Sequence, residues 1–509
     1  MNTLKYKPFI FLATVLLLLA NISCESDLNV IPQGLPTEDL YWRTEAEAII
    51  GINGVYADLS TENHGSEAMY GRGYFWLGCV SDDMAIGRSR ARVESMRDFT
   101  ASGNESELYN LWRVPYLIIK RANDVLRNVP NMSIDEKIKK KIIAEASFLS
   151  GLMYFQLAPI YGDEKAGVPI LDPLKPLDYN KPRATNVTEN YNYIISLLQA
   201  AAEDLPYFHE LKPSEYGRAH KTAAWAYLAK THLYAKNYEE AEKVASKIVS
   251  SGNHTLLKPF EAVFKVKNNF STEYIWSALG SVNPIRGSML PGVMLENKGW
   301  GQYNGWGYMK PTKELYDSFE EGDPRREATI LKPGDIFTYF GNENFEYKPG
   351  GDLSYHTGLQ FKKYMDPFKD VDLVSSNGNY PTTELDIPLM RYAEVLLILA
   401  EAKLMQGKNA DAEINEIRNR VGLPELTGVS LADLKRERRS ELAGEINYRH
   451  FDLIRWGDAQ QVYSKPKHKF DGTQLIPGRK FNPEIHHVWP LPPEEIVRSE
   501  GVLVQNQGW

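Results

Sequence analysis

Long segments of the chain carry apolar residues at the three- and four-residue spacing of one helix face. The clearest spans residues 105–128, and its apolar stripe consists of Leu108, Leu111, Trp112, Pro115 and Ile119. The following segment, 133–161, opens with Ser133 and Glu136 at the spacing of a capping box and ends before Gly162. The two segments therefore predict a helical hairpin.

Helical patterns continue along the chain, over 187–205, 217–236, 238–251, 388–406, 409–420 and 431–444. Strand-like patterns are sparse, with candidates near 273–279 and 359–364. The predicted fold class is therefore all-α (mainly α), with a few short strands.

Two of these regions share a pattern typical of the 34-residue tetratricopeptide repeat, in which small residues lie where two helices touch. The first copy contains Trp225, Leu228, Ala229, Tyr238, Ala241 and Ala245. The second contains Leu396, Leu399, Ala400, Gly407 and Ala412. Ordinary helix packing is the alternative, but two copies with matched offsets favour repeats. Stacked repeats form platforms that typically bind other molecules.

Residues 253–385, between the repeats, are rich in Gly, Pro, Asn and Tyr and have little helical period. A structureless loop of that length is uncommon in a compact domain, so we expect an irregular lobe carried on the helices. The lobe contains the stretch GWGQYNGWGYM at 299–309, with two tryptophans and two tyrosines among four glycines. Glycine disfavours helix and strand, so this stretch predicts a loop that presents aromatic rings.

The first 23 residues have the form of a secretory signal peptide, with Lys5 and Lys7 before an apolar run that ends at Ala20. Cys24 follows at once, as in bacterial lipoprotein signals, in which this cysteine is lipidated. Asn21 departs from the usual leucine, so ordinary cleavage that leaves a free Cys24 is the alternative. Residues 24–40 are predicted to form a polar tether.

Cysteine usage favours lipidation, because 509 residues with only two cysteines have no disulfide framework. Cys79 lies in the apolar run GYFWLGCV and is predicted to be a buried free thiol. Cys24 is then the anchor.

Composition and net charge further restrict the kinds of molecule that the protein is expected to bind. A net charge of -8 and a pI near 5.8 argue against nucleic acid. The basic clusters KIKKK at 137–141 and LKRERRSEL at 434–442 have helical spacing and are interpreted as solvated helix faces.

Several segments, in a fixed order, resemble the SusD/RagB family of outer-membrane nutrient-binding lipoproteins. They include AEASFLSGLMYFQLAPIYGDEKAGVPIL, YGRAHKTAAWAYLAKTHLYAKNYEEAEKVA, KPTKELYDSFEEGDPRR, IPLMRYAEVLLILAEAK, LKRERRSELAGEINYRHFDLIRWG and VWPLPPEEIVRSEGVLVQNQGW. Together with their neighbours they cover nearly all of the mature chain.

The resemblance implies about four tetratricopeptide-like helix pairs in a single SusD-like domain at 41–509. The expected divisions are helical repeats at about 41–252 and 386–460, an irregular ligand-binding lobe at about 253–385, and a C-terminal segment at 461–509. It also implies a cell-surface protein held to the outer membrane by an N-terminal lipid anchor. Such a protein captures oligosaccharide or polysaccharide, or in some members peptide, and delivers it to a SusC-like TonB-dependent transporter.

A sugar presents a face of C–H groups ringed by hydroxyls, so its binding sites combine aromatic rings with planar polar groups. The expected stacking rings are Trp300, Tyr303, Trp306 and Tyr308, with Gln302 and Asn304 as hydrogen-bonding partners. The alternative for one or two of these rings is to tuck under the loop and hold it, and we expect at least one to be structural.

The segment 70–92 is a second candidate, because the resemblance places ligand contacts in this early region. Arg72, Tyr74 and Trp76 alternate as on an extended strand, which would direct them to one face. A core strand is the alternative for them. For Asp82 and Asp83, a core strand with a helix-capping aspartate is favoured over ligand contact.

No catalytic motif is present, and no cofactor or metal is expected. Adjacent Asp82 and Asp83 lack the separation of a glycosidase pair, and adjacent His486 and His487 lack the spacing of a zinc protease, which predicts local packing for the histidines. A secreted glycoside-acting enzyme stays as an alternative, since catalytic carboxylates can come from anywhere in a chain.

Overall fold

The computed structural model describes residues 41–60, 69–175, 180–283, 287–294, 306–350, 354–370, 372, 374, 382–445 and 448–509. The predicted signal peptide, Cys24 and the tether lie outside these residues, as do Trp300, Gln302, Tyr303 and Asn304. Within the described ranges, every helix is too short or too polar to span a bilayer.

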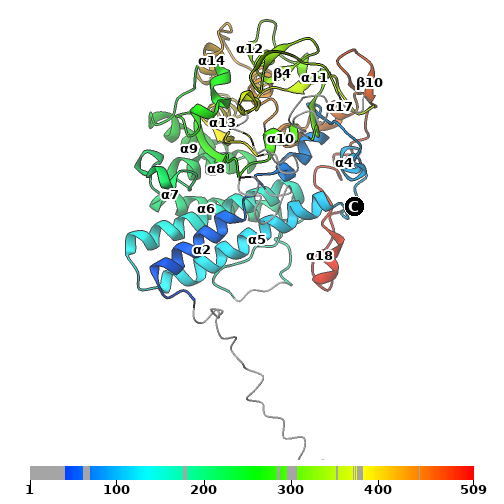
Figure 1. The fold of residues 1–509 in the computed structure, drawn as a ribbon. Helices are drawn as coiled ribbons and strands as arrows, with labels where there is room; N and C mark the ends of the chain where they lie inside the picture. The colour runs from blue at the N-terminus through cyan, green and yellow to red at the C-terminus, as the bar shows by residue number, and fades with distance from the viewer. Residues whose placement is uncertain are drawn as a thin grey trace, which may run out of the picture.

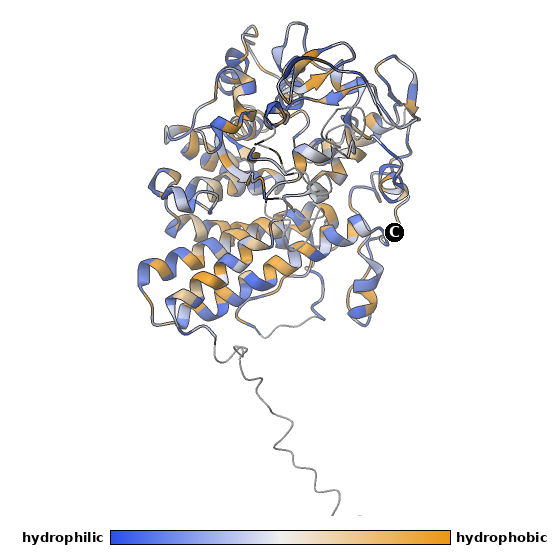
Figure 2. Ribbon diagram, in the orientation of Figure 1, coloured by the Kyte–Doolittle hydropathy of each residue, from blue (hydrophilic) through white to orange (hydrophobic). Residues whose placement is uncertain are grey.

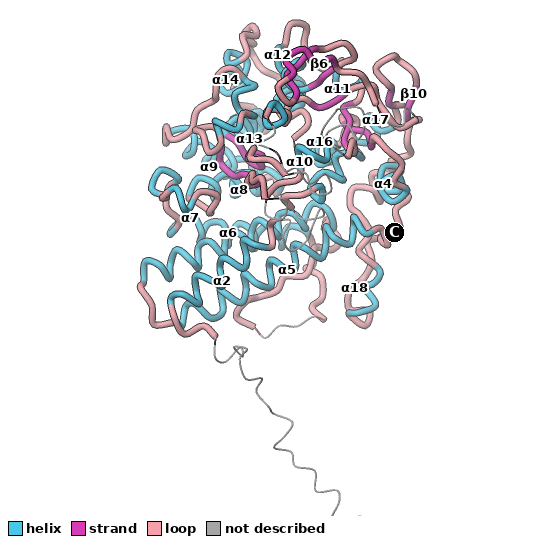
Figure 3. Tube along the Cα trace, in the orientation of Figure 1, coloured by secondary structure: helices cyan, strands magenta, loops and turns pink. Residues whose placement is uncertain are grey.

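Helices dominate the structure, which confirms the predicted mainly α fold class (Figure 3). The long helices are α2 (Glu45–Ala57), α5 (Ser106–Asn128), α6 (Glu136–Tyr161), α7 (Val187–Asp204), α8 (Lys221–Tyr234), α9 (Tyr238–Ser250), α13 (Tyr392–Leu404), α14 (Asp411–Arg420) and α15 (Leu431–Glu441). The short helices are α4 (Ala91–Arg97), α10 (Leu290–Met294), α11 (Lys313–Tyr316), α12 (Pro324–Thr329), α16 (Tyr448–Arg455), α17 (Ala459–Tyr463) and α18 (Pro493–Arg498).

Neighbouring helices pack in a continuous series, in which α5 contacts α6, α6 contacts α7, α7 contacts α8 and α8 contacts α9. Helix α13 then packs on α9, so the second repeat copy docks on the first. Small residues allow this close approach, since Ala229, Ala241, Ala245 and Ala400 are all fully buried. Figure 1 shows α2, α5 and α6 side by side at the base, and in Figure 2 these helices carry both apolar and polar residues.

The strands form small antiparallel pairs. In the described part of the chain these are β1 (Met84–Ile86) with β3 (Met309–Pro311), β2 (Tyr274–Ala278) with β8 (Ile387–Arg391), β4 (Ile330–Leu331) with β7 (Gln360–Phe361), β5 (Ile336–Tyr339) with β6 (Asn342–Glu346), and β9 (Lys467–His468) with β10 (Gln474–Ile476). The strand predicted near 273–279 is confirmed, and that near 359–364 is confirmed for two residues.

Three sequence predictions about helix starts are wrong. The helix predicted over 217–236 begins at Lys221. The helix predicted over 388–406 begins at Tyr392, because the preceding residues form strand β8, paired with β2 and buried throughout. A short apolar run fits a buried strand as well as a helix, and only the pairing decides. Helix α6 has no Ser133–Glu136 capping box. Its N-cap is Asp135, whose carboxylate accepts from the backbone N–H groups of Lys137 and Ile138.

The cluster at 434–442 is not a solvated face, which corrects a further prediction. Glu437, Arg438 and Glu441 on α15 are at most 2% exposed. Glu437 and Glu441 pair with residues of distant segments, and we call the connected group of buried ion pairs around these two carboxylates the buried ionic network. It comprises Glu273, Asp323, Arg325, Lys363, Arg391, Arg418, Arg420, Glu437, Glu441 and Glu445.

The network joins residues between 273 and 363 to α14, α15 and the end of β8. Arg325, at the start of α12, contacts Glu437 (2.5 Å) and Glu441 (3.1 Å) on α15. Arg391, at the end of β8, contacts Glu273 (2.8 Å) as well as Glu441. By contrast, the lysines at 137–141 are exposed or half-exposed, as predicted.

Candidate functional site

Strand pairing brings the two candidate segments of the sequence together. Strand β1 follows the segment around Trp76, and β3 follows the aromatic stretch, with Ile86 opposite Met309. The backbone N–H of Gly87 also donates to the carbonyl of Tyr308 (2.9 Å). A Cβ atom on Gly87 would lie 2.0 Å from the carbonyl oxygen of Gly307, so this close approach requires glycine.

Three rings form a series from the core toward the surface. The Trp76 and Tyr308 rings meet edge to face with centroids 5.6 Å apart, and Tyr308 meets Trp306 in the same way at 6.0 Å. Trp76 is fully buried and Tyr308 is 9% exposed, whereas Trp306 is only half-buried. Trp76 and Tyr308 therefore support Trp306 from beneath, and of the three only Trp306 has substantial exposed surface.

Two arginines after β1 complete this arrangement. The guanidinium of Arg88 lies 5.0 Å from the Tyr308 ring centroid, and that of Arg90 lies 4.9 Å from the Trp76 centroid. Arg88 also donates to the Trp306 carbonyl (3.5 Å), and Arg90 donates to the buried Glu107 of α5 (2.7 Å). We call Trp76, Arg88, Arg90, Trp306 and Tyr308 the Trp306 site.

The sequence prediction missed Arg88 and Arg90. The signal was the alternation of basic residues in RSRAR at 88–92, but nothing in the sequence linked it to residues more than 200 positions away. In the structure both arginines are half-buried beside rings. Their guanidinium groups supply planar hydrogen-bond donors next to aromatic surface.

The strand predicted for Arg72, Tyr74 and Trp76 is wrong, because Arg72–Val80 is a 3₁₀ helix. In that helix residues three apart share a face, so alternate residues do not line up. The side chains of Arg72 and Tyr74 lie outside what the structure describes. Trp76 is a core ring that has no face available to a ligand.

Asp82 and Asp83 are held in ion pairs rather than aimed at a ligand. Arg439 of α15 donates to both carboxylates (2.9 and 2.8 Å), and Arg449 of α16 donates to Asp82 (2.8 Å). Burial opposes ionisation of Asp82, but the two guanidinium groups outweigh it and hold its pKa well below the ordinary value. The pair therefore fixes β1 against α15 and α16. The helix cap expected for it is absent.

The remaining polar candidates are structural. His486 stacks on Phe99 with centroids 5.2 Å apart, and His487 contacts Asp163 (3.2 Å), which confirms the predicted local packing. Cys79 is a buried free thiol, as predicted, and burial raises its pKa to about 12. Among the residues that the structure describes, His, Cys, Asp and Glu form no cluster of three that could hold a metal ion.

Stacked helical repeats that carry a site of aromatic rings and arginines are typical of repeat-based binding proteins. The model of the SusD family matches residues 262–509, and a model described as "Starch-binding associating with outer membrane" matches residues 77–233. The chain belongs to the SusD/RagB family.

The similarity extends over whole chains. SusD-like protein P2 of Formosa agariphila is 26% identical, over 99% of this chain and 100% of the relative. Starch-binding protein SusD of Bacteroides thetaiotaomicron is 24% identical, over 99% of each chain. Among solved structures, a laminarin-binding SusD-like protein superposes with a TM-score of 0.75 at 27% identity, covering 92% of this chain and 100% of the other. Surface glycan-binding protein A from Bacteroides fluxus superposes with a TM-score of 0.76 at 25% identity and the same coverage.

Proposed function

We propose that this protein binds a glycan at the Trp306 site and acts as a binding protein rather than an enzyme. The observation that carries the proposal is the β1–β3 pairing, which places the partly exposed Trp306 beside Arg88 and next to the Tyr308 ring that both Arg88 and Arg90 contact. The names of the relatives support it, since they include starch-, laminarin- and glycan-binding proteins. A peptide ligand is the second candidate, as the family resemblance allows.

In this proposal the exposed part of the Trp306 ring stacks on the C–H face of a sugar. Arg88 and Arg90 donate hydrogen bonds to its hydroxyls, while Tyr308 and Trp76 keep Trp306 in place. Trp300, Tyr303, Gln302 and Asn304 would add contacts from the loop. An open platform of this kind gives modest affinity, with a Kd of about 1 to 100 μM.

We further propose that Cys24 carries a lipid that anchors the protein at the outer-membrane surface. Its partner would be a SusC-like TonB-dependent transporter, to which it delivers the captured glycan. The matched model described as associating with the outer membrane supports this placement. The packed helices offer a broad rigid face for the transporter.

Replacing Trp306 with alanine is expected to weaken glycan binding by about thirtyfold, which corresponds to a typical hot-spot cost of about 2 kcal/mol. The melting temperature should change little, because the ring is only half-buried. Calorimetry with laminarin and soluble starch, paired with thermal melting, measures both.

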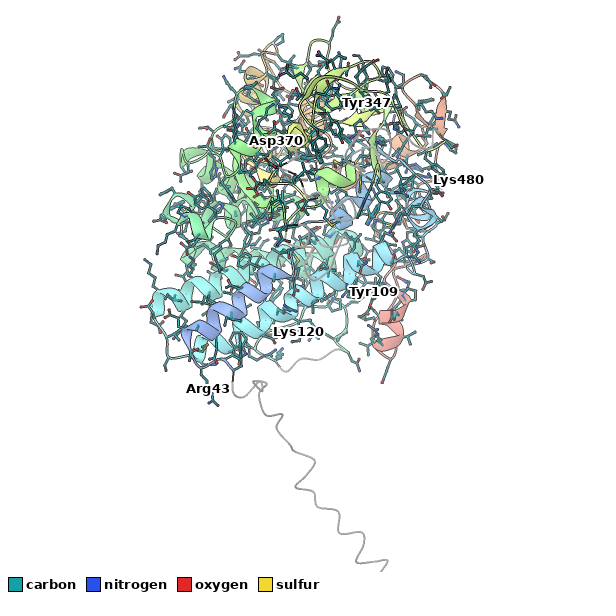
Figure 4. The ribbon with its side chains drawn as sticks, viewed as in Figure 1. Arg43, Tyr109, Lys120, Tyr347, Asp370 and Lys480 are labelled. Carbon is teal, nitrogen blue, oxygen red and sulfur yellow. The ribbon has the colours of Figure 1, made fainter. Side chains whose placement is uncertain are left out.

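Tyr109→Ala is the matched control, because Tyr109 is a half-exposed tyrosine on α5 (Figure 4) whose hydroxyl accepts from Arg498 (3.3 Å) of α18. It should bind as the wild type does. Equal affinity of the wild type and Trp306→Ala would place the ligand elsewhere, and a large drop in melting temperature would assign Trp306 to the core.

Replacing Cys24 with alanine should release the protein from membranes, because lipidation requires the thiol. Fractionation of cells that express the wild type and the variant tests this, with Cys79→Ala as the control that keeps the anchor. Equal membrane association of the wild type and Cys24→Ala would contradict lipidation.

A further inference from the structure

A second group of aromatic residues lies where the loop before α8 meets the loop before β2. The rings of Phe208, Tyr216 and Phe270 contact one another, with centroids 4.9 Å apart for Phe208–Tyr216, 5.2 Å for Tyr216–Phe270 and 6.2 Å for Phe208–Phe270. Tyr216 is 37% exposed, and the other two are half-buried. We call these three residues the Tyr216 cluster.

The backbone at this cluster is strained. Phe270 has φ of 57°, in the left-handed region that a bulky side chain rarely adopts. Such strain persists only where the surrounding structure enforces it, and it concentrates at functional sites. Here it accompanies an arrangement that leaves part of three rings at the surface.

A small cavity lies against the Phe208 and Phe270 rings of this cluster. Its volume is about 20 Å³, enough for one water molecule or one hydroxyl group. Its lining includes Phe208, Gly217, Phe270, Arg218, His220 and Trp276. Because Phe208, Gly217 and Phe270 are all partly exposed, the cavity lies at the protein surface.

Two buried ring nitrogens of this lining have no hydrogen-bond partner. The Nε2 atom of His220 lies 2.7 Å from the carbonyl oxygen of Ile275, which can only accept, so Nε2 carries the proton and Nδ1 is a bare acceptor. Burial, with a smaller contribution from His254, lowers the pKa of His220 to about 3, which keeps the ring neutral. Trp276 contributes an unpaired Nε1–H donor.

The cavity is also electrically neutral. Arg218 donates to the buried carboxylate of Glu145 (2.7 Å), so its charge is already compensated. A buried donor or acceptor that is left unpaired costs free energy, because it has lost its hydrogen bonds to water. An uncharged group that both donates and accepts would relieve both costs at once, and a hydroxyl is such a group.

We propose that the Tyr216 cluster and its cavity form a second carbohydrate subsite. A sugar ring stacks on Tyr216 and Phe270, and one of its hydroxyls enters the cavity, where it donates to His220 Nδ1 and accepts from Trp276 Nε1. The ligand class rests on the proposed function, but the residues are separate from those of the Trp306 site. A long glycan held at two points would bind more tightly than at either alone.

Saturation-transfer NMR with methyl β-D-glucopyranoside at millimolar concentration tests the subsite. The Trp306→Ala protein is the starting point, so that the Trp306 site contributes little signal. Adding Tyr216→Ala should lower the transfer at least fivefold, because the exposed ring is removed. Adding Tyr216→Phe should preserve the transfer, because the ring remains. Adding Tyr109→Ala should also leave it unchanged.

Transfer that is absent from the Trp306→Ala protein, or that survives Tyr216→Ala, would overturn the inference and leave the cavity as a site for a water molecule. The two proposals fail separately. The proposed function fails if Trp306→Ala binds polysaccharide as the wild type does, and this inference fails if Tyr216→Ala has no effect on the glucoside.

Discussion

Replacing Arg391 with methionine is expected to lower the free energy of unfolding by about 3 to 5 kcal/mol, the typical cost of removing one partner from a buried ion pair. Arg391 is 1% exposed and contacts the carboxylates of Glu273 (2.8 Å), Glu441 (2.5 Å) and Glu445 (2.8 Å). Without it these buried carboxylates lose a shared cation. Urea unfolding followed by circular dichroism measures the change.

Arg326→Met is the matched control from the same region of the structure. Arg326 lies on α12, where it pairs with the exposed Glu327 beside it and lies 5.1 Å from the Tyr316 ring centroid, so its loss should cost about 1 kcal/mol or less. A cost below about 1 kcal/mol for Arg391→Met as well would show that the buried ionic network contributes no more than surface pairs do.

Replacing Asp386 with asparagine is expected to change how stability depends on pH. Asp386 is 2% exposed, and its Oδ1 accepts from the Gly280 N–H (2.7 Å), while its Oδ2 has no hydrogen-bond partner. Burial raises its pKa from the ordinary 3.8 to about 7. Asparagine keeps the acceptor for Gly280 and carries no charge.

The direction of the effect follows from proton linkage. Between about pH 4 and 7 the folded protein binds a proton at Asp386 that the unfolded chain does not. The stabilisation that this proton provides is fully present below the pKa of Asp386 in the unfolded chain. It is lost as the pH rises through the pKa of Asp386 in the folded protein. The free energy of unfolding of Asp386→Asn should therefore gain about 2 to 3 kcal/mol on that of the wild type between pH 5 and pH 8, because the wild type loses this contribution over the two pH units from 5 to 7.

Urea unfolding of both proteins at pH 5 and pH 8 provides the measurement. The control is Asp370→Asn, which alters an exposed carboxylate (Figure 4) and should follow the wild type at both pH values. A difference between Asp386→Asn and the wild type that is the same at pH 5 and pH 8 would contradict the raised pKa.

The sequence predicted the helices well because their apolar spacing is local information. The second repeat copy illustrates this, since Leu396, Leu399 and Ala400 lie in α13 and are buried. The predictions from sequence fail where the interaction partners of a residue lie far away along the chain. The charges at 434–442 look solvated in the sequence, but Glu437 pairs with Arg325, which is 112 positions away. Glu437 is buried only in the folded chain, where such distant partners come together around it.

The same distinction between local patterns and distant contacts applies to the candidate site. The sequence predicted the segments around Trp76 and Trp306 as separate candidates, but their contact depends on β1–β3 pairing, which no local pattern encodes. Trp76 lies in an apolar run, and the structure makes it a core ring. Trp300 and Tyr303 lie outside the described residues, so their ligand contacts stay predictions.

The most direct test of glycan binding at the Trp306 site is a crystal structure with a bound oligosaccharide, prepared from laminarin or starch, whichever the protein retains in an affinity gel. We expect a sugar ring stacked on Trp306, with Arg88 or Arg90 within hydrogen-bond distance of its hydroxyls. An oligosaccharide bound elsewhere, with the Trp306 ring free of contact, would contradict this expectation.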